Sequence, residues 1–242
     1  MNEPLPPANF PTTRWSRVAR AGELEGGADA HAALTELCAA YWYPIYALIR
    51  RRGHGEADAL DLTQDYFTRL LEKPLLANAD RGKGRFRAFL LTDCVHFLAN
   101  ARDRENALKR GGGRTFVPID SAIAEGRYSA EPAHDLTPER VFERTWALTL
   151  LAAVFDALRH EFESEGKLAL FEELKVVLEE GPGAVRYSEI AARLGMTEGA
   201  IKVAVHRLRK RYKALLHDQI AATVDDPGEV EDEIRMLFEA LG

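Results

Sequence analysis

Residues 187–216 contain two amphipathic helical patterns separated by a tight turn, and this arrangement constrains the fold more than any other stretch. The apolar residues of the first pattern recur at helical spacing: Ile190, Ala191 and Leu194. Ser188 is placed to cap this helix, Gly195 is placed where helices end in a left-handed residue, and Thr197 can cap the next helix. The stretch therefore predicts a helix-turn-helix.

The second helical pattern is basic on the face opposite its apolar residues. The apolar residues recur at steps of four, three, four and three: Ile201, Val205, Leu208, Tyr212 and Leu215. The other face carries Lys202, His206, Arg207, Arg209, Lys210, Arg211 and Lys213. From 198 to 213, six Lys or Arg against one Glu give +5, in a chain of formal net charge -6. This local excess favours DNA binding, with bases read in the major groove and phosphates neutralised.

Length and composition indicate a soluble, cytoplasmic chain. The 242 residues suffice for one large or two small domains, and an apolar content of 46% is ample for a core. No stretch reaches the roughly 18 apolar residues of a membrane span, and no signal peptide is evident. The two cysteines, Cys38 and Cys94, lie far apart in apolar patterns, so we expect buried thiols in a reducing cytoplasm and no metal site.

Helical periodicity and turn residues predict an all-α fold of two helical bundles joined by a flexible linker. The Pro-rich residues 1–13 are expected to be poorly ordered. The first bundle is expected over 14–110, with Pro44 inside a helix that begins near Asp29. Glycines and prolines mark 111–136 as the linker. The second bundle is expected over 137–224, where Thr137 and Pro138 open a helix.

Two stretches of the first bundle carry polar patterns with alternative interpretations. A helix after Gly55 has an acidic face that includes Asp61 and Asp65, which suits either solvent or a docked partner. Residues 86–110 mix aromatics with cations. This mixture suits single-stranded nucleic acid, although aromatics on a helix more often belong to a core.

Residues 225–242 form an acidic extension with a final helix. Seven acids and one Arg give a net charge of -6. Its expected apolar edge is Ile234, Leu237, Phe238 and Leu241. The helix either packs back on a domain or acts as a regulatory segment that competes for the basic face of the recognition helix.

Three stretches, in order, resemble the bacterial RNA polymerase sigma factors of the compact extracytoplasmic-function (ECF) type. They are DALDLTQDYFTRLLEK, FRAFLLTDCVHFLANARDR and YSEIAARLGMTEGAIKVAVHRLRKRYKALL, and with their flanks they cover most of 31–110 and 137–216. The resemblance implies a first domain that binds the β′ clamp helices of core RNA polymerase and the melted −10 element. It implies a second domain that reads duplex −35 DNA and meets the β flap, with no cofactor.

The resemblance also implies roles for individual residues. The −35 contacts would be Lys202, Val203, His206 and Arg207 in the groove, with Arg209 and Lys210 on the backbone. The −10 contacts would be Arg85, Arg87, His96, Asn100, Arg102 and Arg104. The polymerase-docking residues would be Asp61, Leu62, Gln64, Asp65 and Phe67. The loop 80–85 would form a pocket for a flipped base.

Three departures from the family pattern stand out. The segment 159–183 is longer than the short turn usual there, and Val203 is apolar where a polar residue is common, which suits contact with a thymine methyl. The acidic extension is an addition to the minimal pattern, and inhibition would come either from an external anti-sigma factor or from this extension acting on the recognition helix.

Two other classes of function remain as alternatives to a sigma factor. One is a one-component helix-turn-helix regulator that binds a palindromic duplex as a dimer, and the other is a protein-only adaptor. An enzyme is not expected, because neither metal-ligand spacing nor a GxSxG or P-loop motif is present. Association with core RNA polymerase would distinguish a sigma factor from both alternatives.

Overall fold

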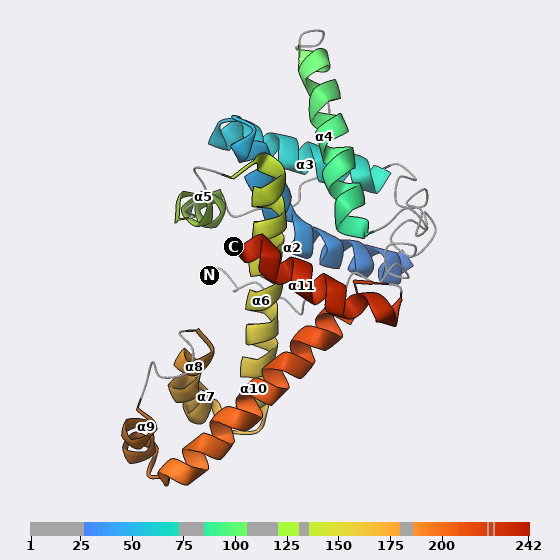
Figure 1. The fold of residues 1–242 in the computed structure, drawn as a ribbon. Helices are drawn as coiled ribbons and strands as arrows, with labels where there is room; N and C mark the ends of the chain where they lie inside the picture. Colours follow the sequence, from blue (N-terminus) through green and yellow to red (C-terminus); the bar gives the residue numbers. More distant parts are fainter. Residues whose placement is uncertain are drawn as a thin grey trace. The chain divides into compact units, whose positions relative to one another are not determined.

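The computed structural model describes residues 27–72, 85–105, 121–130, 136–179, 186–221, 223–224 and 226–242. Every regular element in these ranges is helical, which confirms the predicted all-α fold (Figure 1). The helices are α2 (Gly27–Arg51), α3 (Glu56–Glu72), α4 (Phe86–Glu105), α5 (Ser121–Ala130), α6 (Pro138–Ser164), α7 (Leu168–Leu174), α8 (Val176–Glu179), α9 (Tyr187–Leu194), α10 (Glu198–Ala221), the 3-10 helix η2 (Pro227–Glu229) and α11 (Val230–Leu241). The expectation for residues 1–13 lies outside the described residues.

The contacts divide the chain into two compact units. Among the described residues, the first unit contains those up to Leu150 together with 220–242, and the second contains 151–219. The divisions fall inside α6 and α10, whereas the sequence predicts them near 111–136 and after 224. The start of α6 and the acidic helix α11 therefore belong with the N-terminal helices.

Aromatic side chains from α2, α3 and α4 form the core of the first unit. Tyr41 packs edge-on against Phe86, with their ring centroids 5.7 Å apart, and both rings are buried. Pro44 lies inside α2, as predicted, without ending the helix. The hydroxyl of Tyr66 donates a hydrogen bond of 3.1 Å to the carbonyl oxygen of Leu90, which ties α3 to α4. These contacts set the position of the predicted docking helix, α3.

Helix α5 lies within the predicted linker and contacts α2. The guanidinium of Arg50 pairs with both carboxylate oxygens of Glu125, at 3.0 and 2.7 Å. The hydroxyl of Tyr46 donates to the same carboxylate at 2.6 Å. The guanidinium of Arg127 lies 3.9 Å from the ring centroid of Tyr43. At least this part of the linker is therefore a helix attached to the first unit.

Helix α11 buries a face that matches the expected apolar edge in part, since Leu237 is buried and Ile234 and Leu241 are half-buried. Its buried residues are Val230, Glu233 and Leu237, which recur at steps of three and four. Phe238, which the sequence analysis assigns to the apolar edge, is 53% exposed. The expectation fails for Phe238 because a carboxylate, Glu233, takes the place of an apolar residue in the buried stripe. A hydrogen bond of 2.5 Å from Arg144 to the carbonyl oxygen of Leu241 ties the end of α11 to α6.

The second unit is built on one hydrophobic cluster. Its buried members come from α6, α7, α8, α9 and α10: Leu158, Phe171, Leu174, Val177, Ile190, Ala191, Ile201, Val205 and Leu208. The helix expected over 168–178 is two shorter helices, α7 and α8, separated at Lys175. This cluster supports the helix-turn-helix formed by α9 and α10.

Candidate nucleic-acid interface

The turn between α9 and α10 has the geometry that the sequence predicts, except at the start of α9. Gly195 adopts the left-handed conformation, with φ of 64°, and Met196 N–H donates to the carbonyl of Ala191 at 2.9 Å. The hydroxyl of Thr197 accepts from the N–H of Ala200 at 3.2 Å, which confirms it as a cap. The predicted capping by Ser188 is wrong, because α9 begins one residue earlier, at Tyr187.

We call residues 198–213 of α10 the recognition helix. Its apolar face packs into the hydrophobic cluster of the second unit. Ile201 and Leu208 are fully buried, and Val205 is 4% exposed. All three pack in the cluster that holds Ile190 and Ala191 of α9. Burial of this face turns the opposite side of the helix outward.

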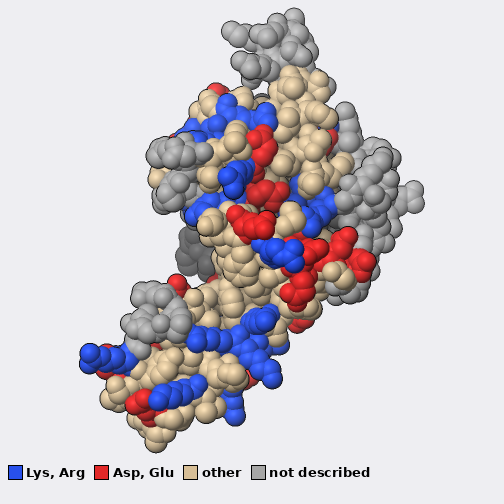
Figure 2. Space-filling view, viewed as in Figure 1, with Lys and Arg blue, Asp and Glu red and all other residues tan. Residues whose placement is uncertain are grey.

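The outward side of the recognition helix presents the predicted −35 residues. Exposed side chains on it are Lys202, Val203, His206, Arg207 and Lys210, whereas Arg209 is half-buried. Lys202 pairs with Glu198 at 2.8 Å, one turn earlier on the same helix. Among the described residues, Arg207, Arg209 and Lys210 have no acidic partner within ion-pair distance. On the face in Figure 2, Lys and Arg side chains gather over this helix. The arrangement suits phosphates and base edges.

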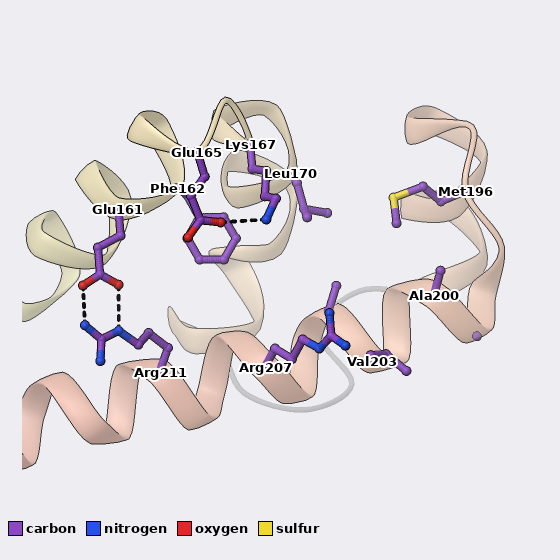
Figure 3. A pocket seen from close by; sticks show the side chains of 12 residues that line it. Glu161, Phe162, Glu165, Lys167, Leu170, Met196, Ala200, Val203, Arg207 and Arg211 are labelled. Atoms are coloured by element: carbon purple, nitrogen blue, oxygen red, sulfur yellow. Dashed lines mark hydrogen bonds and ion pairs between the residues drawn. The ribbon is translucent and has the colours of Figure 1, made fainter.

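A groove lies beside the recognition helix, between it and the turn that joins α6 to α7 (Figure 3). Its lining includes Phe162, Leu170, Met196, Val203, Arg207 and Arg211. Val203 is 50% exposed and Met196 is 38% exposed, so both apolar side chains are open to contact. An apolar strip beside a cation suits a thymine methyl group next to a backbone phosphate.

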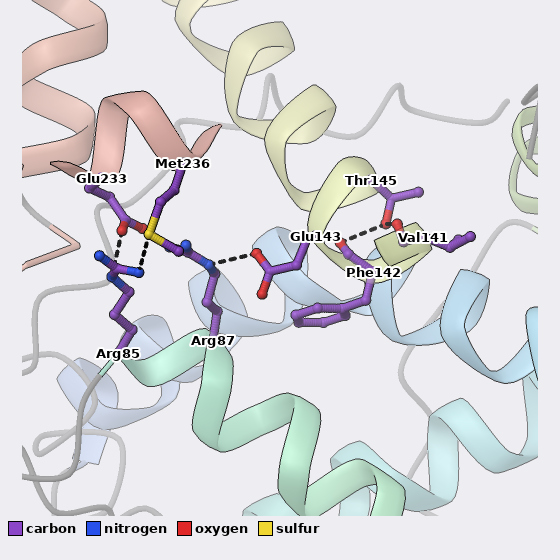
Figure 4. Close-up of polar contacts among 8 residues, drawn as sticks. All are labelled: Arg85, Arg87, Val141, Phe142, Glu143, Thr145, Glu233 and Met236. Atoms are coloured by element: carbon purple, nitrogen blue, oxygen red, sulfur yellow. Dashed lines mark hydrogen bonds and ion pairs between the residues drawn. The ribbon is translucent and has the colours of Figure 1, made fainter. Parts of the chain in front are cut away.

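The two arginines expected to meet the −10 element at the start of α4 are engaged inside the first unit (Figure 4). Arg87 is 4% exposed, forms ion pairs with Glu143 at 2.8 Å and with Glu233, and lies 4.3 Å over the ring of Trp146. Its desolvation by burial lowers the pKa of Arg87. Arg85 pairs with Glu233 at 2.6 Å. The expectation that Arg87 faces DNA is therefore wrong for this conformation.

The other predicted −10 residues lie further along α4. His96 and Asn100 are exposed and lie four residues apart, so they share one face of the helix. Arg102 and Arg104 belong to the last turns of α4, but their side chains lie outside the described part. The predicted base pocket at 80–85 also lies outside it, apart from Arg85. The accessible candidates that the structure describes on α4 are thus His96 and Asn100.

The predicted docking residues on α3 divide into surface and core. Asp61 is exposed, and Leu62, Gln64 and Asp65 are half-buried. Phe67 is 1% exposed and packs against Tyr66, with ring centroids 5.5 Å apart. Its assignment as a surface contact is wrong, because its ring belongs to the core of the first unit. Phe67 therefore contributes to the packing that positions α3 and not to its docking surface.

The residues around Arg87 were not predicted as a site from the sequence: Glu143, Trp146 and Glu233. Glu233 was the most recognisable of these, because it lies between Val230 and Leu237 at the spacing of a buried stripe. A carboxylate at such a position requires a cationic partner. No local pattern identifies Arg85 and Arg87 as that partner.

The described residues contain neither a candidate metal site nor a candidate membrane span. No group of three or more His, Cys, Asp or Glu there has the geometry to hold a metal ion. None of the helices in the described ranges is both long enough and apolar enough to cross a membrane.

The chain is similar to a known bacterial sigma factor. The chain is 27% identical over 172 residues to the ECF RNA polymerase sigma factor SigE of Mycolicibacterium smegmatis. The match covers 71% of this chain and 57% of that protein's length. No protein-family model matches the chain, and no solved structure matches it. The likeness is in keeping with a distant relationship to ECF sigma factors.

Proposed function

We propose that this chain is a transcription initiation factor that binds core RNA polymerase and directs it to specific promoters. The observation that carries the proposal is the exposure of Arg207 and Lys210 on the outward side of the recognition helix, whose opposite, apolar face is packed in the core. The likeness to an ECF sigma factor over 71% of the chain supports the same class of protein.

The second unit is the duplex reader in this proposal. Lys202, Val203, His206 and Arg207 contact bases of the −35 element, because the N-terminal half of a recognition helix enters the major groove. Arg209 and Lys210 contact phosphates. The same unit also contacts the β flap of the polymerase.

The first unit binds the polymerase and the melted strand. The polar side of α3, which contains Asp61, Gln64 and Asp65, binds the β′ clamp helices. The exposed His96 and Asn100 of α4 contact the −10 strand. The chain works in the cytoplasm by binding alone, without a catalytic step or a cofactor.

Transcription in vitro tests the proposal. Purified chain and core RNA polymerase are incubated with genomic fragments from the source organism, and run-off transcripts are sequenced. We expect transcripts that start at defined sites and depend on the chain. Tight binding of the chain to duplex DNA as a dimer, with no effect on polymerase, would contradict the proposal and favour a one-component regulator.

A further inference from the structure

The carboxylate of Glu233 is buried against two arginines from a distant part of the sequence (Figure 4). Glu233 is 1% exposed, and it pairs with Arg85 at 2.6 Å and with Arg87. Arg85 also donates to the sulfur of Met236, one turn further along α11, at 2.6 Å. One turn of α11 thus contacts both guanidinium groups.

The pairing of Glu233 with two arginines shows that this site can bind an anion. A carboxylate loses much hydration when buried, so it stays ionised only where cations compensate. Arginine binds phosphate with the same planar donor geometry that it offers to a carboxylate. The cations that hold Glu233 are therefore suited to hold a phosphodiester in its place.

The two arginines lie at the start of the helix that carries the exposed −10 candidates. Arg85 immediately precedes α4 and Arg87 lies in its first turn, and His96 and Asn100 follow on its outer surface. Acidic side chains gather over α11 on the face in Figure 2, and Glu231 and Asp232 are exposed beside the buried Glu233. A negative helix at this position repels a nucleic-acid backbone and also occupies its cations.

We propose that Arg85 and Arg87 form an anion site for the backbone of single-stranded DNA, and that α11 is a built-in competitor whose Glu233 occupies that site. The inference rests on the proposed function, because it assigns the site to the melted promoter strand. It revises the expectation that the acidic extension acts on the recognition helix. Of the two arginines, Arg85 is the more available after release, since Arg87 keeps Glu143 and Trp146 as partners.

The affinity for labelled single-stranded DNA, measured without polymerase, tests whether α11 competes for this site. The full chain is compared with a chain that ends at Val224, and with Glu233→Gln and the matched control Glu231→Gln. The probe is a fluorescein-labelled oligonucleotide rich in A and T, followed by anisotropy at low salt. We expect about tenfold tighter binding after truncation, because six net negative charges are removed and two arginines are released. Glu233→Gln should bind several-fold tighter, and Glu231→Gln should change affinity much less than Glu233→Gln.

Hydrogen exchange on the intact chain tests the same idea if truncation disturbs folding. Saturating oligonucleotide should speed amide exchange across 230–241, because the strand displaces α11 from the arginines. A folded truncated chain that binds no tighter than the full chain would overturn the competitor, and so would unchanged exchange in α11 at saturation. If the truncated chain binds more tightly but never supports transcription, the competitor stands and the proposed function fails.

Discussion

The guanidinium of Arg211 donates two hydrogen bonds to the carboxylate of Glu161, at 2.7 and 2.5 Å, and so ties the recognition helix to α6 (Figure 3). Arg207 lies one turn earlier on the same helix and has no acidic partner within ion-pair distance among the described residues. Two arginines that look equivalent in sequence therefore differ in what they can offer to DNA. The predictions for the second unit follow from this difference.

Arg207→Ala should weaken binding to the −35 duplex by about 1–3 kcal/mol and relax sequence preference at one position, because the side chain reaches a base edge. The measurement is anisotropy of labelled duplexes that differ by single substitutions. Arg211→Ala is the matched control and should lower affinity less, since Glu161 already neutralises its charge. A larger effect at Arg211 would show that the DNA-facing side of α10 is assigned incorrectly.

Arg209→Ala should lower affinity by a similar factor on every duplex tested. The residue is assigned to a phosphate, and phosphate contacts carry no direct sequence information. Removal of one such contact should reduce the slope of log affinity against log salt concentration by about 1. Titrations at several salt concentrations measure this slope, and an effect confined to one duplex sequence would indicate a base contact instead.

Asp61→Arg should reduce association with core RNA polymerase. Asp61 is exposed on α3, and reversal of its charge opposes any basic surface that docks there. Glu56→Arg is a charge-matched control, because five residues along a helix turn the side chain by roughly 140°. Co-purification with core enzyme measures the effect, and DNA binding by the same variants should be unchanged. Equal loss with both variants would argue against this docking site.

The two thiols should resist modification in the folded chain. Cys38 and Cys94 are buried, and desolvation raises the pKa of each to about 12. The reactive thiolate is therefore scarce at neutral pH. A colorimetric thiol reagent should react slowly with the native chain and rapidly with both thiols after denaturation in urea. Fast reaction of one thiol in the native chain would contradict its burial.

Glu125→Gln should destabilise the first unit at neutral pH, by about 1 kcal/mol after allowance for partial exposure. The hydrogen bond from Arg50 holds the pKa of Glu125 below its ordinary value. A lowered pKa in the folded state stabilises the fold above the unfolded-state pKa, and this contribution is lost as pH falls through the folded-state pKa. The difference between wild type and variant in urea denaturation should therefore shrink between about pH 5 and about pH 3. A difference that grows on acidification would exclude this pair as its source.

Local patterns predicted much of the candidate site. The steps of four and three in α10 correctly assigned Ile201, Val205 and Leu208 to the buried face, because helical geometry alone decides which side chains share a side. Gly195 and Thr197 were recognisable because a left-handed residue and a capping hydroxyl satisfy backbone groups within a few residues. The resemblance to sigma factors also came from contiguous stretches, and the comparison with a known protein supports it in coarse form.

The sequence by itself determined the helical class, the helix-turn-helix and the outward basic face, since each depends on interactions within a few turns of chain. Tertiary structure decided that Arg87, which the sequence places among the exposed DNA contacts, is enclosed by Glu143, Trp146 and Glu233 in this structure. It also decided that part of the expected linker is α5, attached through Glu125 to Arg50, 75 residues away. Charge pairing between distant segments leaves no periodic signal, so only the folded chain reveals which cations are engaged within it and which remain available to a partner.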